Sequence, residues 1–117
     1  MIRIVAHREA KWMDRRADSS QWDQLARAYE AELQLINDDD LYTTVDTTVV
    51  VVDEEGVTEI ESFQHPDDAT YIFGRTGMSV MNFPHDVSVR IDTPQPKSLF
   101  GVEAAAIVLQ HRATQWH

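Results

Sequence analysis

The feature that most constrains the fold is a run of four consecutive valines, 49–52, which two threonines precede. Valine and threonine branch at Cβ and favour extended backbone, so this run predicts a β-strand over 47–52. The strand is apolar on both faces, and such strands are typical of parallel sheets that are covered on both sides. The polar segment 53–56, Asp-Glu-Glu-Gly, then ends it as a turn. The run therefore predicts a central strand of a parallel sheet.

The rest of the chain alternates between strand and helix patterns. Ser19 or Ser20 can cap a helix whose apolar side chains keep a helical spacing up to Leu33, a residue that also fits the next strand. We predict helices over 19–33 and 98–114, and strands over 2–6, 33–36, 57–63 (at an edge), 69–73 and 87–91. Apolar strands separated by helices predict an α/β fold, with a mainly parallel sheet and helices on both faces. No repeat or linker interrupts the sequence, so we predict a single domain over residues 1–117.

Length and composition narrow the class of protein. The 117 residues include no cysteine, which excludes a disulfide framework and a cysteine-ligated zinc site. No apolar run approaches the ~20 residues of a membrane-spanning helix. The segment 1–7 is too short and too quickly charged for a signal peptide. These features predict a soluble protein of the cytoplasm.

Charge is unevenly distributed along the chain. The formal net charge is −10, but residues 1–27 carry six basic and four acidic side chains. This segment is therefore +2, and residues 28–117 carry −12. An anionic partner such as RNA would meet the N-terminal segment, while the rest of the surface would repel it. The alternative is that the acidic excess only keeps the protein soluble.

The last third of the chain has an order of parts that predicts a pocket. A strand over 69–73 ends in Gly74 and Gly77, and a second strand over 87–91 ends in a segment rich in proline and serine that opens a helix. Glycines leave backbone N–H and C=O groups accessible. Loops that follow neighbouring parallel strands lie side by side, and a backbone-lined pocket there suits an adenosine-type ligand. Alternatively, the two glycines only turn the loop.

These segments resemble a known family. The string 63–74, Phe-Gln-His-Pro-Asp-Asp-Ala-Thr-Tyr-Ile-Phe-Gly, is similar to a segment of SPOUT-class RNA methyltransferases, in which His-Pro and an acidic pair precede a strand that ends in glycine. The run 89–94, followed by Ser-Leu at 98–99 and the alanine-rich 102–109, resembles the last motif of that family. The resemblance is to the TrmH-like ribose 2′-O group and covers residues 63–112.

The resemblance implies a C-terminal trefoil knot, a homodimer, and an S-adenosylmethionine-dependent methyltransferase that acts on a ribose 2′-hydroxyl of tRNA or rRNA. Members of the family bind the cofactor against three loops of the knot. Carried over to this sequence, the cofactor-binding residues are Ile72 and Phe73 at the end of the strand 69–73, Gly74, Thr76 and Gly77 in the first loop, Ile91, Thr93 and Pro94 at the second, and Ser98, Leu99 and Phe100 in the third. Ile72, Phe73 and Ile91 can sandwich an adenine.

The sequence departs from the family pattern at several polar positions. Thr76 stands where the family usually has Glu, Phe100 replaces an Asn, and Val102 replaces a small polar residue. Gln21 and Asp23 replace the Asn and Gly of the N-terminal motif. These departures leave the expected fold unchanged. They favour an alternative function, a catalytically inactive knot-fold dimer that binds S-adenosylmethionine or a protein partner.

Arg27 falls where that N-terminal motif has its arginine, which makes it the candidate catalytic residue. Methyl transfer from a sulfonium chiefly needs alignment and a way to handle the hydroxyl proton. A guanidinium beside a ribose and its phosphate would supply positioning and charge complementarity. Alternatively, Arg27 is a solvated residue on an exposed helix face.

No metal site is predicted. The five histidines have no spacing typical of metal ligands, and His65 lies in a proline turn that is typical of the surface. The aspartates at 38–40, with Asp46, raise the question of calcium. The segment lacks the glycine and the terminal glutamate of a calcium loop, so a solvated turn is the better interpretation.

Overall fold

The computed structural model describes residues 1–9, 15–37, 47–75, 78–94, 99 and 101–115, and this part of the chain forms six strands and two α-helices. The elements are β1 (Ile2–His7), α1 (Arg15–Ala28), β2 (Ala31–Ile36), β3 (Thr48–Val52), β4 (Thr58–Glu59), the 3₁₀ turn η1 (Ile60–Ser62), β5 (Ala69–Phe73), β6 (Val87–Arg90) and α2 (Gly101–Gln115). The predictions for β1, β3, β5 and β6 are confirmed to within one residue at each end.

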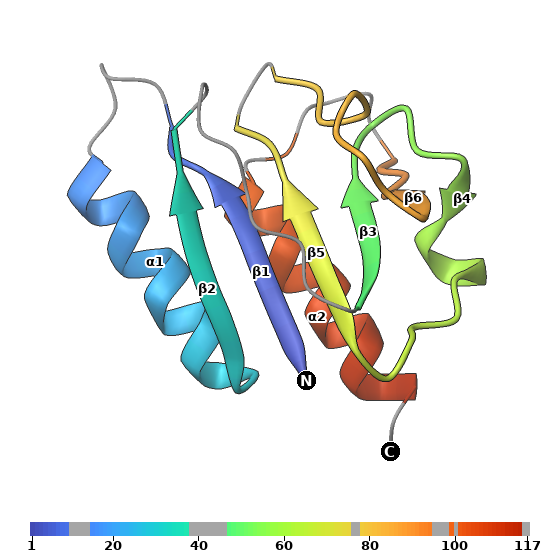
Figure 1. The fold of residues 1–117 in the computed structure, drawn as a ribbon, viewed down its shortest axis with the longest axis horizontal. Coiled ribbons are helices and arrows are strands. Elements are labelled where there is room, and N and C mark those ends of the chain that lie inside the picture. Colours follow the sequence, from blue (N-terminus) through green and yellow to red (C-terminus); the bar gives the residue numbers. More distant parts are fainter. Residues whose placement is uncertain (10–14, 38–46, 76–77, 95–98, 100, 116–117) are drawn as a thin grey trace.

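The strands form one sheet in the order β2-β1-β5-β3-β6-β4, and every neighbouring pair is parallel (Figure 1). β3, the valine strand, lies between β5 and β6, with Val50 aligned to Tyr71 on one side and to Val87 on the other. All five residues of β5 are buried. The parallel pairing confirms the predicted α/β fold with a mainly parallel sheet, and the strands at its centre, β5 and β3, are mostly buried.

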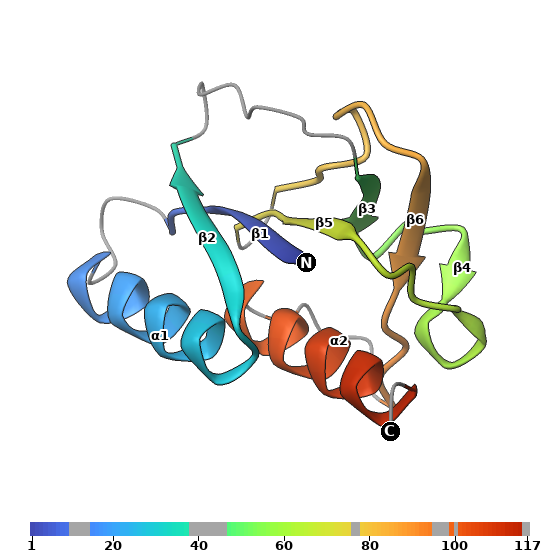
Figure 2. The same ribbon diagram turned by 60° about the horizontal axis from the view of Figure 1, so that its bottom comes forward.

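Both helices cover the same face of the sheet (Figure 2). Trp22 and Ala26 of α1 and Val108 of α2 join one core with strand side chains that include Tyr71 and Phe73. The rings of Trp22 and Phe73 lie 5.6 Å apart, centroid to centroid, so α1 is packed directly onto β5. This is the larger of the two cores.

The opposite face carries a smaller core in which a loop takes the place of a helix. Val51 and Ile72 point to this face and pack with Val80, a fully buried residue of the segment between β5 and β6. Phe83 of the same segment packs against them. The prediction of helices on both faces is therefore wrong for the described residues. An irregular segment with its own apolar side chains can cover a sheet, but it has no periodicity that identifies it in a sequence.

Helix boundaries differ most from the predictions. α1 begins at Arg15 instead of Ser19 or Ser20, and it ends before a turn in which Glu30 has a positive φ of 53°. Leu33, which fitted two patterns, lies in β2. α2 begins at Gly101, later than predicted. Tertiary packing fixes these ends, because intrinsic helix preferences differ by only about 0.7 kcal/mol per residue among ordinary residues.

The edge of the sheet is irregular. The predicted edge strand over 57–63 is a two-residue strand, β4, followed by η1. In η1, Ile60 is buried and joins the larger core. Among the described helices, neither is long and apolar enough to cross a membrane.

Candidate functional site

A pocket of about 260 Å³ opens at the carboxyl edge of the sheet, where β3, β5 and β6 end and α2 begins. Its lining residues come from four separate segments of the chain: Val52, Asp53, Glu54 and Glu55; Phe73, Gly74, Arg75, Met78 and Ser79; Ile91; and Leu99, Gly101 and Ala104. Ligands of open parallel α/β sheets bind at this edge. The volume lies just below the usual range of small-molecule pockets.

The wall of the pocket has an apolar part and a charged part. Met78, Ile91 and Leu99 are the large, partly exposed apolar residues of the lining, and behind them lies Phe73, which is only 1% exposed. The polar side chains of the wall are Asp53, Glu54, Glu55, Arg75 and Ser79. Three carboxyl groups against one guanidinium favour a ligand that offers hydroxyl or ammonium donors over one that carries several phosphates.

The loop after β5 and the start of α2 meet through two glycines. A Cβ atom on Gly101 would lie 2.7 Å from the carbonyl oxygen of Gly74 and 3.2 Å from Cζ2 of Trp22. A Cβ atom on Gly74 would lie 2.7 Å from the carbonyl oxygen of Met78. A carbon atom does not fit at such a distance from an oxygen, so the close approach requires glycine at both positions. This part of the wall is therefore bare backbone.

Asp53 connects two walls of the pocket. Its Oδ2 accepts hydrogen bonds from Ser79 Oγ at 3.0 Å and from the Val80 N–H at 2.8 Å, and its Oδ1 accepts one from the Glu55 N–H at 3.0 Å. The residue pattern of 53–56 predicts only a turn and does not identify this segment as part of the site. One signal was available, because the turn directly follows the carboxyl end of the predicted central strand.

Four of the predicted cofactor-binding residues line the pocket: Phe73, Gly74, Ile91 and Leu99. Ile72 does not, because successive residues of a strand point to opposite faces and Ile72 belongs to the core of the other face. Thr93 and Pro94 are described but are not part of the lining. The remaining predicted positions, Thr76, Gly77, Ser98 and Phe100, lie outside the described residues.

Arg27 lies far from the pocket within one chain. α1 runs antiparallel to the strands, so its last turn, which holds Arg27, is at the amino edge of the sheet (Figure 1). The side chain is 81% exposed and forms an ion pair with Asp23 at 3.1 Å, four residues earlier on the same helix. The structure therefore does not bring Arg27 to the pocket, whereas Arg75 does line it.

A buried polar cluster, formed by His65, Tyr71, His111 and Arg112, lies between β5 and α2. His65 Nδ1 is 2.7 Å from the Tyr71 hydroxyl and His65 Nε2 is 2.9 Å from His111 Nδ1, while Arg112 Nη1 donates to the Tyr71 hydroxyl at 3.1 Å. Burial, and then the charges of His111 and Arg112, lower the pKa of His65 to about 4. The prediction of a surface histidine is wrong, because α2 covers the turn and leaves His65 only 6% exposed.

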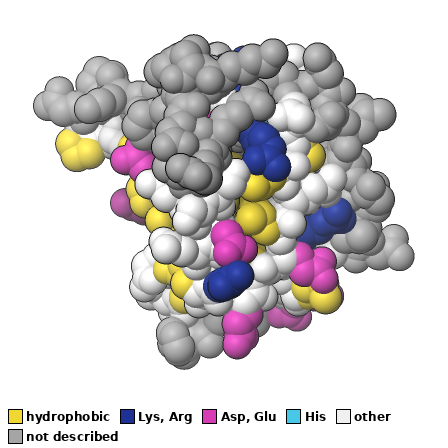
Figure 3. Space-filling view, turned by 90° about the vertical axis from the view of Figure 1, so that its left-hand side faces the viewer, with side chains coloured by type: hydrophobic (Ala, Val, Ile, Leu, Met, Phe, Trp, Pro, Cys, Tyr) yellow, Lys and Arg dark blue, Asp and Glu magenta, His cyan; other side chains and the backbone are white. Residues whose placement is uncertain are grey.

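Charged side chains do not separate by sign on the side of the molecule that carries α1 and β2. Among the described residues of this face, Lys and Arg are interspersed with Asp and Glu (Figure 3). In the described part of the chain, no three His, Cys, Asp or Glu side chains are grouped so that they could hold a metal ion.

No protein-family model matches the sequence, and no curated protein is significantly similar to it. Several solved structures nevertheless superpose closely on the chain. A protein solved for insight into the 2-OH methylation of C/U34 on tRNA superposes with a TM-score of 0.77 at 13% identity, over 98% of this chain and 90% of that one. The SpoU methyltransferase AviRb from Streptomyces viridochromogenes, solved in complex with AdoMet, gives a TM-score of 0.75 at 13% identity, over 97% of this chain and 57% of that one.

A third structure, assigned to the TrmH family of RNA methyltransferases and from Porphyromonas gingivalis, gives a TM-score of 0.70 at 12% identity, over 95% of this chain and 58% of that one. The chain thus spans somewhat more than half of the second and third of these proteins. At such low identity the likeness concerns the fold. The described chain has the fold of SpoU/TrmH-type SPOUT methyltransferases, as the resemblance of its C-terminal motifs implied.

Proposed function

We propose that the protein is an S-adenosylmethionine-dependent RNA methyltransferase that acts on a ribose 2′-hydroxyl of tRNA or rRNA. The observation that carries this proposal is the pocket at the carboxyl edge of β3, β5 and β6, in a chain that shares its fold with an AdoMet-bound SpoU methyltransferase. A cytoplasmic location and a C-terminal trefoil knot are proposed with it.

The lining of the pocket fits such a cofactor. Met78, Ile91 and Leu99 provide an apolar surface for an adenine, and the glycine contact between Gly74 and Gly101 leaves backbone groups next to it. Carboxylates accept hydrogen bonds from ribose hydroxyls and from ammonium groups, and the turn after β3 supplies several. When bound there, S-adenosylmethionine supplies an activated methyl group. The other predicted loop residues remain proposed ligands because of the family resemblance: Thr76, Gly77, Thr93, Pro94, Ser98 and Phe100.

The proposed catalytic role of Arg27 requires a second copy of the chain. Within one chain Arg27 lies at the amino edge of the sheet and the pocket at the carboxyl edge. In the homodimer that we propose, Arg27 of one copy would lie beside the pocket of the other. There its guanidinium would hold the RNA phosphate and orient the ribose, so that the attacking hydroxyl is aligned.

A second candidate function is that of a non-catalytic protein of the same fold, which binds S-adenosylmethionine or a protein partner. Two observations favour it. The net charge of −10 opposes an electrostatic grip on RNA, and the charges on the described face over α1 and β2 are mixed in sign. The two functions share the pocket and differ in the reaction.

Calorimetric titration with S-adenosylmethionine and S-adenosylhomocysteine tests the pocket. We expect wild-type protein to bind both. The Ala104→Trp variant should weaken binding at least about tenfold, because an indole in place of a methyl group at the lining fills the pocket. Ala106→Trp, two positions along the same helix and outside the lining, is the matched control and should bind as wild type. No heat from either compound with wild-type protein would remove both functions.

Transfer of tritiated methyl groups to bulk RNA then separates the enzyme from the binder. Acid-stable methyl incorporation that depends on an intact pocket supports the methyltransferase. Cofactor binding without any incorporation, on tRNA and on rRNA alike, supports the second function. Digestion to nucleosides identifies the methylated position, and a base-methylated product would contradict the 2′-O assignment.

A further inference from the structure

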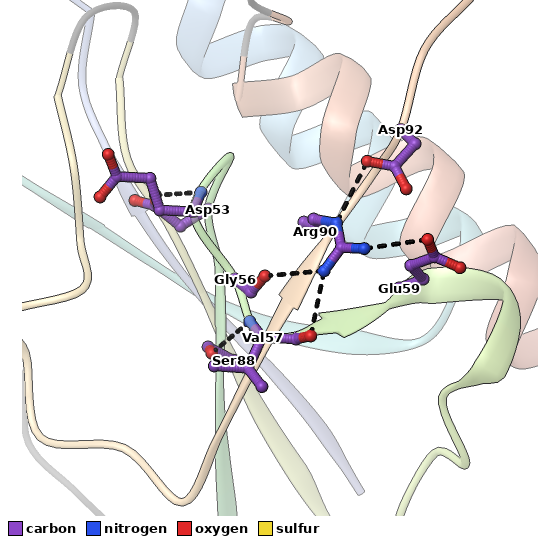
Figure 4. A network of polar contacts seen from close by, with 8 residues as sticks. Asp53, Gly56, Val57, Glu59, Ser88, Arg90 and Asp92 are labelled. Atoms are coloured by element: carbon purple, nitrogen blue, oxygen red, sulfur yellow. Dashed lines mark hydrogen bonds and ion pairs between the residues drawn. The ribbon is translucent and has the colours of Figure 1, made fainter.

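The turn between β3 and β4, residues 53–57, forms the acidic wall of the pocket, and one arginine outside the pocket fixes its position. The guanidinium of Arg90, at the end of β6, donates through Nη1 to the carbonyl oxygens of Gly56 at 3.2 Å and Val57 at 3.0 Å. Nη2 donates to Glu59 Oε1 at 2.9 Å, and Nε donates to Asp92 Oδ1 at 3.2 Å. Figure 4 shows the guanidinium at the centre of these four contacts.

Other contacts join the same turn to β6. The Val57 N–H donates to Ser88 Oγ at 2.9 Å, and the Asp53 N–H donates to the carbonyl oxygen of Val89 at 3.0 Å. A Cβ atom on Gly56 would lie 2.4 Å from the carbonyl carbon of Val89, so the turn is pressed against the backbone of β6. Backbone contacts therefore bring the turn to the strand, and Arg90 closes over it from the side.

Arginine is suited to this task and lysine is not. The contacts to two carbonyl oxygens and two carboxylates use separate N–H groups of a planar fork that stays charged at all relevant pH values. The side chain is 30% exposed, so these hydrogen bonds are partly shielded from water. A lysine ammonium offers three donors from a single atom and cannot span the same four acceptors.

We propose that Arg90 is a positioning residue of the pocket. It holds the 53–57 turn against β6 and so sets where Glu54 and Glu55 meet a ligand. Ile91, the next residue along the chain, is itself part of the lining, so one side chain fixes the apolar and the acidic wall relative to each other. The inference rests on the proposed function only for the identity of the ligand, S-adenosylmethionine.

The first test needs no ligand. Amide hydrogen exchange of the Arg90→Gln variant should lose protection at Gly56 and Val57 by about tenfold or more, while the amides of β5 stay protected, because the opening is local. Arg3→Gln is the matched control. It also removes a partly buried arginine that hydrogen-bonds another strand, through Gln34 Oε1 at 2.7 Å, but on the far side of the sheet. Unchanged protection of the turn in Arg90→Gln would overturn the proposal.

The second test measures coupling to the ligand. By calorimetry, Arg90→Gln should bind S-adenosylmethionine about tenfold more weakly than wild type, which is the size of one lost charge-assisted contact. In a background that already carries Glu54→Gln and Glu55→Gln, the same substitution should have little further effect on binding, because Arg90 acts on the ligand by placing these two carboxylates. Equal losses in both backgrounds would show a purely structural effect and contradict the positioning role.

The Arg90→Lys variant distinguishes the effect of the guanidinium geometry from the effect of its positive charge. We expect it to bind no more than about threefold better than Arg90→Gln, since it keeps the charge and loses the paired carbonyl contacts. Wild-type affinity and wild-type exchange in Arg90→Lys would overturn the inference. If wild-type protein binds neither cofactor form, the proposed function and the ligand half of this inference fail together, and the exchange data still decide whether Arg90 holds the turn.

Discussion

His65, in the buried polar cluster between β5 and α2, takes part in its hydrogen bonds only in the neutral form. Arg112 donates to the Tyr71 hydroxyl. In the arrangement that satisfies every group, this hydroxyl donates to His65 Nδ1, and His65 Nε2–H donates to His111 Nδ1. Only a neutral His65 can take part in this chain, which agrees with its pKa being lowered to about 4 from an ordinary value of 6.5. Burial raises the pKa of Tyr71, so its hydroxyl keeps the proton that it donates.

This cluster predicts a loss of stability in mild acid. The unfolded chain takes up a proton at His65 below about pH 6.5 and the folded chain does so only near pH 4, so the free energy of unfolding falls as the pH drops through this window. Above pH 6.5 His65 is neutral in both the folded and the unfolded chain, so its contribution to the free energy of unfolding no longer changes with pH. Urea unfolding at pH 7.5, 5.5 and 4.5 measures it.

His65→Gln should be less stable than wild type at pH 7.5 by about 1–3 kcal/mol, because it leaves buried partners unsatisfied. Its stability should fall less steeply than that of wild type below pH 6.5. His85→Gln is a control on the β5–β6 segment, where the imidazole contacts the Phe83 carbonyl oxygen. Identical pH slopes for wild type and His65→Gln would rule out this role for His65.

Among the elements, the contact between the loop after β5 and the start of α2 decides the shape of the pocket. Gly101→Ala tests it, because two effects oppose each other. Alanine is about 1 kcal/mol better than glycine in a helix interior, and this gain is smaller at Gly101 because it is the first residue of α2. A Cβ atom 2.7 Å from the Gly74 carbonyl oxygen must push the loop away, and overpacking of this kind costs about 1–3 kcal/mol. We expect the clash to win, with a net loss of stability and weaker binding of S-adenosylmethionine.

Chemical denaturation and calorimetry on the same preparations measure both effects. Glu103→Gln, an exposed position in the first turn of α2, is the control; it keeps the shape of the side chain and should change stability by no more than about 1 kcal/mol, the size of a charge–helix-dipole interaction. A Gly101→Ala protein that is more stable than wild type and binds equally well would mean that the contact is loose.

The elements also show where sequence patterns suffice. β3 is a run of valines after Thr48, and β5 is buried at every position, and segments of this kind have few places in a fold other than the middle of a parallel sheet. The residues from Met78 to Phe83 carry no such pattern, although Val80 is fully buried. Ile72 and Phe73 are adjacent and equally apolar, yet only Phe73 faces the pocket. The face to which a strand residue points follows from the register of the sheet, which a sequence does not display.

At the level of the assembly, the separation of Arg27 from the pocket means that a catalytic role for Arg27 requires the proposed homodimer, with each site shared between two copies. We predict that Arg27→Ala and Ala104→Trp are each inactive in methyl transfer. When the two are unfolded, mixed in equal amounts and refolded, random pairing should restore about a quarter of wild-type activity, because each mixed dimer holds one intact site. A mixture without activity, from proteins that form dimers in sedimentation, would place Arg27 outside the site.

The class of fold follows from the sequence alone. Runs of β-branched residues, and glycines placed after a strand, express local preferences that hold wherever the segment is put. The sequence also located the strand ends that carry Phe73, Gly74 and Ile91. The tertiary structure alone decided that both helices lie on one face, that the 53–57 turn forms an acidic wall, that Arg90 fixes this wall, and that Arg27 lies at the opposite edge. These outcomes depend on the order and register of strands that are distant in sequence, and no local pattern encodes them.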